Sequence, residues 1–510
     1  MIIVLNFGGQ FTHLITRRIR EAGCYAEILP FDATYKKIKE LNPQGIILSG
    51  GPRSVNEKGA PFCSEKILSI GVPILGICYG HQLLAKMLGG KVELGSSGEY
   101  GKEFIEVLNR SNLFKGLEKR EQVWFSHGDK IEKLPKNVKR LAKTSNCAVA
   151  AFGDEGKKIY GVQFHPEVIH TLKGNKILSN FVFDICRAQK NWKVENFKKQ
   201  LIEKVKREVG GDSVIIGVSG GVDSMVAATL LHKAITNKLY CVLVDTGLMR
   251  KKEVREVEEV FKKMKFKHFH VVNAQKEFVN KLGAVIDPEE KRKIIARTFI
   301  REFEKKAKEL QKKARIKFLA QGTIYPDRIE SAQPSKEAAK IKSHHNVALP
   351  KKMKFKIIEP LQELYKDEVR DLGRKLGLAE NIIGRHPFPG PGLAIRILGK
   401  ITKKRLDILR EVDRIYISEL KKTGQYNKIW QAFAALLPIR SVGVMGDSRT
   451  YDYIITLRAV TSRDGMTADW ARIPDDILEN ISNKIINRVA GVNRVLFDIS
   501  QKPPSTIEYQ

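Results

Sequence analysis

A cysteine framed by two glycines is the first group in the sequence that could do chemistry. The segment 76–80 reads GICYG, follows an apolar run and precedes a helical pattern of leucines. Glycines two residues before and after a nucleophile let the chain turn sharply and present the side chain. The dipole of the following helix would also favour the Cys78 thiolate. An isolated cysteine is more often a small buried apolar residue, but this frame predicts a nucleophile.

The segment 161–168, GVQFHPEV, supplies the partners that a thiolate nucleophile requires. His165 stands at the end of an expected strand, and Glu167 follows one proline later. An imidazole can shuttle protons for the thiolate, and a carboxylate can orient the imidazole. Either side chain alone would more often be structural, but their combination with the cysteine elbow predicts a triad of Cys78, His165 and Glu167.

A second candidate site follows the apolar run 214–218, where the chain reads SGGVDS before a helical pattern. Glycines and hydroxyl side chains at a helix N-terminus expose several N–H groups to a phosphate. The spacing of a Walker A loop and its lysine are both absent. The segment 219–224 therefore predicts a phosphate-binding turn of another kind.

Four segments around the cysteine resemble the class I (triad) glutamine amidotransferase domain: GICYGHQ (76–82), FHPE (164–167), SGGP (49–52) and NFGGQ (6–10). The resemblance implies that Cys78 attacks the side-chain amide of glutamine, that His165 transfers protons and that Glu167 holds His165. It further implies an oxyanion hole made by the N–H groups of Gly51 and Tyr79, with Gln82 helping to bind glutamine.

The turn at 219–224 resembles the PP-loop of ATP pyrophosphatases, which bind the pyrophosphate end of ATP. The resemblance implies that Asp223 holds Mg²⁺. The ATP-binding residues that it implies are Ser219, Gly220, Gly221, Val222, Asp223 and Ser224.

Five further segments resemble the GMP synthetase family, in its glutamine-hydrolysing form: QGTIYPDRIES (321–331), IKSHHN (341–346), RHPFPGPGLAIR (385–396), AVTSRDGMTADW (459–470) and KPPSTIEYQ (502–510). The resemblance implies that XMP, ATP and glutamine are converted to GMP, AMP, pyrophosphate and glutamate by a homodimer. The implied XMP-binding residues are Arg292, Pro389, Gly390, Gly392, Lys502, Thr506, Ile507 and Glu508. The implied lid residues are Asp327, Glu330, Lys342, His344 and His345.

The elements that must position these groups alternate between apolar strands and helical patterns. Several of the strands are too apolar for a half-exposed sheet, which predicts α/β domains with covered sheets. We expect two doubly wound α/β domains, a class I amidotransferase at 1–190 and a PP-loop ATP pyrophosphatase at 191–385. The pattern at 386–510, with a strand hairpin around GDSRT, predicts a small C-terminal α+β domain. The resemblance to GMP synthetase implies that this domain binds XMP and forms the dimer.

The formal charge of +33, from 90 Lys+Arg and 57 Asp+Glu in 510 residues, first suggests nucleic acid as a partner. An RNA-modifying PP-loop enzyme is therefore the alternative. Sulfur transfer would require reactive cysteines, however, and residues 191–510 contain only Cys241. A silent regulator is disfavoured by the intact triad. Small-molecule substrates, no nucleic acid and no membrane are expected. Six scattered cysteines and no signal-peptide pattern predict a cytoplasmic setting.

Overall fold

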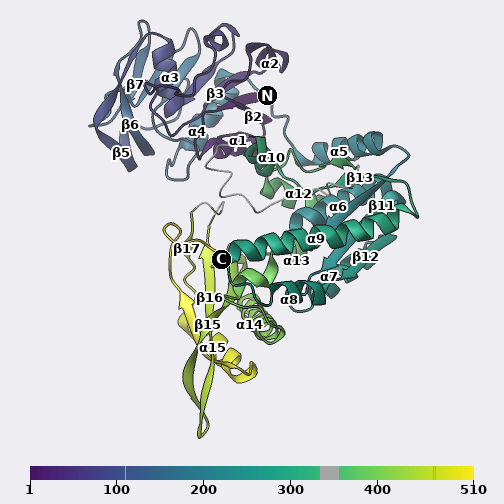
Figure 1. Cartoon of the computed structure of the whole chain (residues 1–510). Helices are drawn as coiled ribbons and strands as arrows, with labels where there is room; N and C mark the ends of the chain where they lie inside the picture. The colour runs from purple at the N-terminus through teal and green to yellow at the C-terminus, as the bar shows by residue number, and fades with distance from the viewer. Residues whose placement is uncertain (110, 333–354, 463–464, 466) are drawn as a thin grey trace. The chain divides into compact units, whose positions relative to one another are not determined.

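The computed structural model describes residues 1–109, 111–332, 355–462, 465 and 467–510 (Figure 1). The chain forms two compact units, Met1–Asn196 and Phe197–Gln510. The predicted boundaries at 190 and 385 stay predictions. Within the described residues, no helix is both long enough and apolar enough to cross a bilayer.

Unit 1 is built on a nine-stranded sheet of order β2-β1-β3-β4-β9-β8-β7-β5-β6. The strands from β2 to β9 in this order are parallel, and the remaining pairs are antiparallel. Strands β1, β3, β4 and β9 are buried along their whole length, so the predicted covered sheet is confirmed. The strands are β1 (Ile2–Asn6), β2 (Ala26–Pro30), β3 (Gly45–Leu48), β4 (Ile74–Ile77), β5 (Lys91–Val107), β6 (Arg120–Lys133), β7 (Lys139–Lys143), β8 (Ala151–Asp154) and β9 (Ile159–Val162).

The helices of unit 1 are short and pack their apolar side chains onto this sheet. They are α1 (Thr12–Glu21), α2 (Tyr35–Glu40), α3 (Tyr79–Met87) and α4 (Gly174–Ser179), with a 3₁₀ turn at Glu65–Ser69 and a π turn at Asn180–Ile185. Helix α3 is almost entirely buried and follows β4 directly. The strand-to-helix step predicted around the cysteine is therefore present in the parallel part of the sheet, between β3 and β9.

Unit 2 contains a five-stranded parallel sheet of order β12-β11-β10-β13-β14. After β10, the chain adds β11 and then β12 on one side of the sheet. It then crosses back and adds β13 and β14 on the other side of β10. Crossovers in opposite directions place helices on both faces, with α9 on one face and α6 and α12 on the other (Figure 1). The strands are β10 (Ser213–Val218), β11 (Leu239–Asp245), β12 (His268–Asn273), β13 (Ile316–Ala320) and β14 (Lys356–Ile358). The helices are α5 (Val194–Val209), α6 (Val222–Ile235), α7 (Glu253–Lys263), α8 (Gln275–Leu282), α9 (Pro288–Gln311), α10 (Tyr325–Ala332), α12 (Lys366–Leu376) and α13 (Glu380–Ile383).

The C-terminal part of unit 2 is a second sheet in which β16 pairs antiparallel with β15 and β17 and parallel with β18. Its elements are a 3₁₀ turn at Gly392–Arg396, α14 (Lys403–Lys422), β15 (Gln431–Met445), β16 (Ser448–Thr461), β17 (Asp469–Trp470), α15 (Asp475–Arg488) and β18 (Val492–Asp498). The predicted hairpin is confirmed, because Met445 pairs with Ser448 at its tip. One continuous apolar core joins the parallel sheet to α14 and the C-terminal sheet.

Candidate active site

Cys78 occupies a strained turn between β4 and α3. Its φ of 53° and ψ of −104° are rarely adopted by a non-glycine residue. The flanking glycines are required by space, because a Cβ on Gly76 would lie 2.3 Å from the Gly80 carbonyl oxygen and one on Gly80 would lie 2.3 Å from the Leu48 carbonyl oxygen. The predicted elbow is therefore present, and its glycines cannot be replaced without moving the backbone.

His165 and Glu167 form a buried pair just beyond the end of β9. His165 Nδ1 lies 2.7 Å from Glu167 Oε1, and the two residues are 5% and 1% exposed. The backbone of His165 is also fixed, because its N–H donates to the Trp124 carbonyl and its carbonyl accepts from Thr171 Oγ1. A carboxylate bound to Nδ1 leaves Nε2 to exchange protons with a nucleophile.

The three predicted triad residues come together around Gly50. A Cβ placed on Gly50 would lie 3.2 Å from His165 Cε1 and 3.6 Å from Cys78 Cβ. Burial would lower the pKa of His165, but the charges of Glu167 and Cys78 outweigh it and raise the pKa to about 10. The buried carboxylate of Glu167 thus favours the protonated imidazole beside the Cys78 sulfur, where it can donate a proton.

The other residues predicted for this site surround the cysteine. Tyr79 is the first residue of α3, and a Cβ on Gly51 would lie 3.2 Å from Tyr79 Cγ, so both candidate N–H donors are close together. Gln82 is buried one turn further along α3. Its Nε2 donates to the Asp129 carbonyl at 2.9 Å and to Gln163 Oε1 at 3.1 Å. A direct contact of Gln82 with glutamine stays a prediction.

The phosphate-binding candidate lies where β10 meets α6. Gly220 has φ of 76°, and the Ser219 N–H and hydroxyl both contact Ser224 Oγ at 3.2 Å. The Gly221 N–H donates to Ser219 Oγ at 3.3 Å, and Val222 opens the helix. Ser219 and Gly221 are exposed, so these N–H and hydroxyl groups can exchange their mutual contacts for phosphate oxygens.

Asp223, in the first turn of α6, pairs with Lys366, a residue that the sequence did not indicate. Lys366 Nζ, at the start of α12, lies 2.5 Å from Asp223 Oδ2. Within the described residues, the buried Asp223 Oδ1 has no hydrogen-bond partner. A carboxylate oxygen of this kind suits a hard cation such as Mg²⁺. Gly322, from the 321–331 segment, lies close enough that its Cβ would be 3.3 Å from the Asp223 carbonyl carbon.

The residues predicted to bind XMP gather around the C-terminal segment. Glu508 forms a bidentate pair with Arg396, whose side chain is fully buried, and also accepts from Gln431. Gly392 has φ of 64°, and a Cβ there would lie 2.4 Å from the Leu248 carbonyl oxygen. Among the described residues other than its two chain neighbours, no atom lies within 4 Å of a Cβ on Gly390.

The basic residues predicted for the XMP phosphate, Arg292 and Lys502, contact backbone oxygens. Arg292 donates to the Gln510 carbonyl at 2.7 Å, and Lys502 Nζ donates to the Gly465 carbonyl at 2.7 Å. Ile507 is buried, the Thr506 hydroxyl donates to the Glu508 carbonyl, and the Pro389 carbonyl accepts from the Gly392 N–H. Arg292 thus contacts the C-terminal residue, whereas the role of the whole set in binding XMP stays a prediction.

The predicted lid is described only at its start. Asp327 lies in the first turn of α10, where its Oδ2 accepts from the Ile324 N–H at 3.2 Å. Glu330 belongs to the same helix, but its side chain is not described. Lys342, His344 and His345 lie outside the described residues. The lid therefore stays a prediction.

The sheets, the cysteine elbow and the turn before α6 define a class of protein. This class is a glutamine amidotransferase joined to an ATP pyrophosphatase-type domain. Residues 3–185 match the model of the family "Glutamine amidotransferase class-I", residues 193–319 match "NAD synthase", and residues 418–509 match "GMP synthase C terminal domain".

Curated relatives define the family more narrowly. The chain is 55% identical to the GMP synthase [glutamine-hydrolyzing] of Caldicellulosiruptor saccharolyticus, 52% identical to that of Aquifex aeolicus and 54% identical to that of Thermosipho melanesiensis. Each comparison covers 100% of this chain and 99% of the relative. The chain belongs to the glutamine-hydrolysing GMP synthase family.

Proposed function

We propose that this chain makes GMP by two linked reactions, with Cys78, His165 and Glu167 releasing ammonia from glutamine. Cys78 Sγ attacks the side-chain carbonyl carbon of glutamine, and the oxyanion is stabilised by the N–H groups of Gly51 and Tyr79. His165 gives its proton to the departing ammonia, which breaks the C–N bond and leaves a thioester. His165 then takes a proton from water as the water attacks the thioester, and glutamate leaves.

The second reaction takes place in unit 2. The N–H and hydroxyl groups of 219–224 bind the pyrophosphate end of ATP while an oxygen of the XMP base attacks the α-phosphorus and displaces pyrophosphate. Ammonia then displaces AMP from the adenylated carbon to give GMP. Mg²⁺ held by Asp223 would neutralise part of the charge on the pyrophosphate. Lys366 and Arg385 add positive charge at the same turn, since Arg385 reaches the Gly220 carbonyl at 3.4 Å.

One observation carries this proposal. The chain holds both a triad in which Cys78, His165 and Glu167 come together and a separate turn in which Asp223 pairs with Lys366. An XMP-dependent assay that follows AMP, pyrophosphate and glutamate together tests it. We expect the three products in equal amounts when glutamine is the nitrogen donor. Glutamate without AMP at saturating XMP, or AMP without pyrophosphate, would contradict the coupled reactions. Tight retention of tRNA in physiological salt would instead support the RNA-modifying alternative.

The proposal also includes a homodimer formed by the C-terminal sheet. Val442 and Tyr451 face each other across β15 and β16, and they are 56% and 61% exposed. Val444, two residues further along the same strand, is 76% exposed. A row of exposed apolar side chains on one sheet is typical of a subunit interface. We expect sedimentation to give a dimer and Val444→Asp to shift it toward monomer; a monomeric wild-type chain would contradict this.

We also propose that the protein works in the cytoplasm. All six cysteines are buried and free of disulfides, as expected for a reducing compartment.

A further inference from the structure

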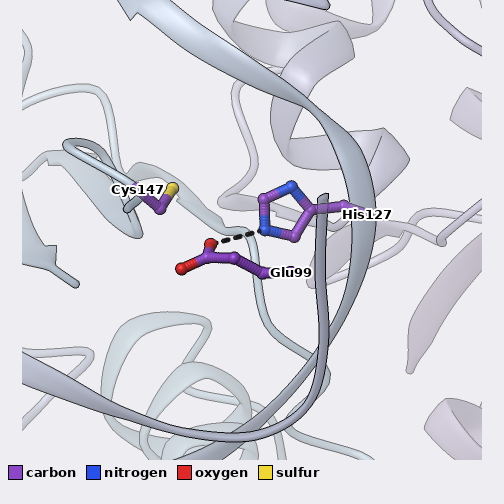
Figure 2. A group of neighbouring side chains, drawn as sticks. All are labelled: Glu99, His127 and Cys147. Carbon is purple, nitrogen blue, oxygen red and sulfur yellow. Dashed lines mark hydrogen bonds and ion pairs between the residues drawn. The ribbon is translucent and has the colours of Figure 1, made fainter. Parts of the chain in front are cut away.

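A buried charged group lies behind the cysteine elbow, outside every predicted site. Glu99 of β5 and His127 of β6 are 4% and 5% exposed, and Glu99 Oε2 lies 2.9 Å from His127 Nε2 (Figure 2). The second carboxylate oxygen accepts from Thr144 Oγ1 at 2.7 Å. Both oxygens of Glu99 are therefore held, and the imidazole is fixed against one of them.

The hydrogen bonds of His127 hold its ring at both nitrogens. His127 Nδ1 lies 2.9 Å from the Asp129 carbonyl oxygen, which can only accept, so Nδ1 carries a hydrogen. Burial would raise the pKa of Glu99, but its hydrogen bonds with His127 and Thr144 outweigh this and lower the pKa. Both ring nitrogens of His127 and both carboxylate oxygens of Glu99 thus have buried partners. Removing one member of the pair would leave polar atoms of the other buried without a hydrogen bond.

The same bonds reach the wall of the proposed glutamine site. The Asp129 carbonyl that accepts from His127 also accepts from Gln82 Nε2, and the N–H of Gln82 donates to the Cys78 carbonyl. The carbonyl of Ser126, one residue before His127, lies 3.6 Å from Cys78 Sγ. The segment 126–129 is thus held by His127 on one side and touches the nucleophile and Gln82 on the other.

We propose that Glu99 and His127 are positioning residues for the glutamine reaction, because the buried pair holds the segment 126–129 against Cys78 and Gln82. This inference rests on the proposed function of the triad. The pair touches neither the reacting sulfur nor His165, so it acts through the backbone of 126–129. Loss of the Glu99–His127 pair would shift the segment 126–129, and a displacement of about 1 Å beside a nucleophile costs on the order of 100-fold in rate.

Cys147 allows this role to be distinguished from metal binding. Ligand atoms of Glu99, His127 and Cys147 all lie within 4.8 Å of one another, which a transition metal could bridge. However, burial and the charge of Glu99 raise the pKa of the Cys147 thiol to about 12, and a proton already joins His127 to Glu99. Figure 2 shows a contact between Glu99 and His127 and none to Cys147. Positioning requires the pair alone, whereas a metal site would require the cysteine too.

The test compares Glu99→Gln with four other variants of the full chain, using either glutamine or ammonia as nitrogen source. For Glu99→Gln we expect glutamine-dependent kcat/KM to fall about 10-fold to 100-fold, mainly in kcat, with ammonia-dependent synthesis within about twofold of wild type. Glu99→Asp, which keeps the charge, should recover part of the loss. Glu106→Gln is the matched control. Glu106 lies on β5, as Glu99 does, and its half-exposed carboxylate faces Lys143.

Cys147→Ala should leave glutamine-dependent activity unchanged, and elemental analysis of the wild type should find no stoichiometric zinc or other transition metal. Stoichiometric zinc that Cys147→Ala removes would overturn the inference in favour of a metal site. Full glutamine activity in Glu99→Gln, or equal loss with both nitrogen sources, would overturn it as well. Cys78→Ala in the same assay separates the two proposals: if it abolishes glutamine use while Glu99→Gln keeps full glutamine activity, only this inference fails.

Discussion

The two candidate catalytic sites are held in place to different degrees. In unit 1, Cys78, His165 and Glu167 are 6%, 5% and 1% exposed, and buried contacts fix each of them. In unit 2, Ser219 and Gly221 are exposed and bond mainly to other groups of the same turn. A nucleophile must be aligned before its substrate arrives, whereas N–H and hydroxyl groups that bind phosphate can keep temporary partners until the ligand replaces them.

The largest effect should come from the turn in unit 2. Asp223→Ala removes the proposed magnesium ligand and leaves Lys366 unpaired, so GMP formation should fall on the order of 10⁴-fold or more with either glutamine or ammonia. Steady-state assays with both nitrogen sources measure this. Asp371→Ala, which removes a half-exposed carboxylate paired with Lys375 on α12, is the control and should be nearly silent. Ammonia-dependent turnover near wild type in Asp223→Ala would refute the assignment.

The next effect should be confined to unit 1. Glu167→Gln keeps the shape of the side chain but removes the charge that stabilises the imidazolium, so glutamine-dependent synthesis should fall on the order of 10³-fold. Ammonia-dependent synthesis should not change. Glu40→Gln, which removes an exposed carboxylate near Lys36, is the control. An equal loss with both nitrogen sources would show that the two sites are not separable in this way.

Two glycine substitutions, one in each unit, compare how tightly the two sites are packed by their effect on the free energy of unfolding. Gly80→Ala places a Cβ 2.3 Å from the Leu48 carbonyl oxygen, so it should lower the free energy of unfolding by about 2–3 kcal/mol and impair the elbow. In the part of the chain that the structure describes, a Cβ on Gly390 meets no atom within 4 Å apart from its chain neighbours, so Gly390→Ala should change stability by less than about 0.5 kcal/mol. Denaturant unfolding measures both. Equal values for the two variants would contradict the tight packing of the elbow.

The smallest effect concerns pH. The folded-state pKa of His165 is raised from 6.5 to about 10, so its stabilising contribution is complete below about pH 6.5 and is lost as the pH rises through 10. The Tm of the unit 1 transition should therefore fall between pH 7 and pH 10. The fall should be smaller in Glu167→Gln, whose His165 loses the main charge that raises its pKa. Parallel Tm curves for the two proteins would argue against the buried ion pair.

The sequence predicted much of the fold because buried parallel strands are nearly continuous apolar runs. Strands such as β1, β4 and β10 could be located in this way. The elbow and the turn before α6 were also predictable, because glycines that the backbone requires leave a pattern at short spacing. The continuous core between the parallel sheet and α14 was not, since it joins residues far apart in the chain.

Single charged residues of the sites could not be found from sequence. Lys366 meets Asp223 across 143 positions, and Glu99 meets His127 across 28. In a chain with 29% charged residues, one lysine or glutamate carries no spacing signal. Such residues are distinguished by burial and by a partner, and only the folded structure supplies both.

The role of Cys78 is tested most directly by measuring GMP formation in Cys78→Ala with glutamine and with ammonia at high concentration. We predict that synthesis from glutamine is abolished, while ammonia supports AMP and pyrophosphate release at near the wild-type rate. Glutamine-dependent synthesis that survives the substitution would contradict the role of Cys78. A loss of ammonia-dependent synthesis would contradict the division of labour between the two units.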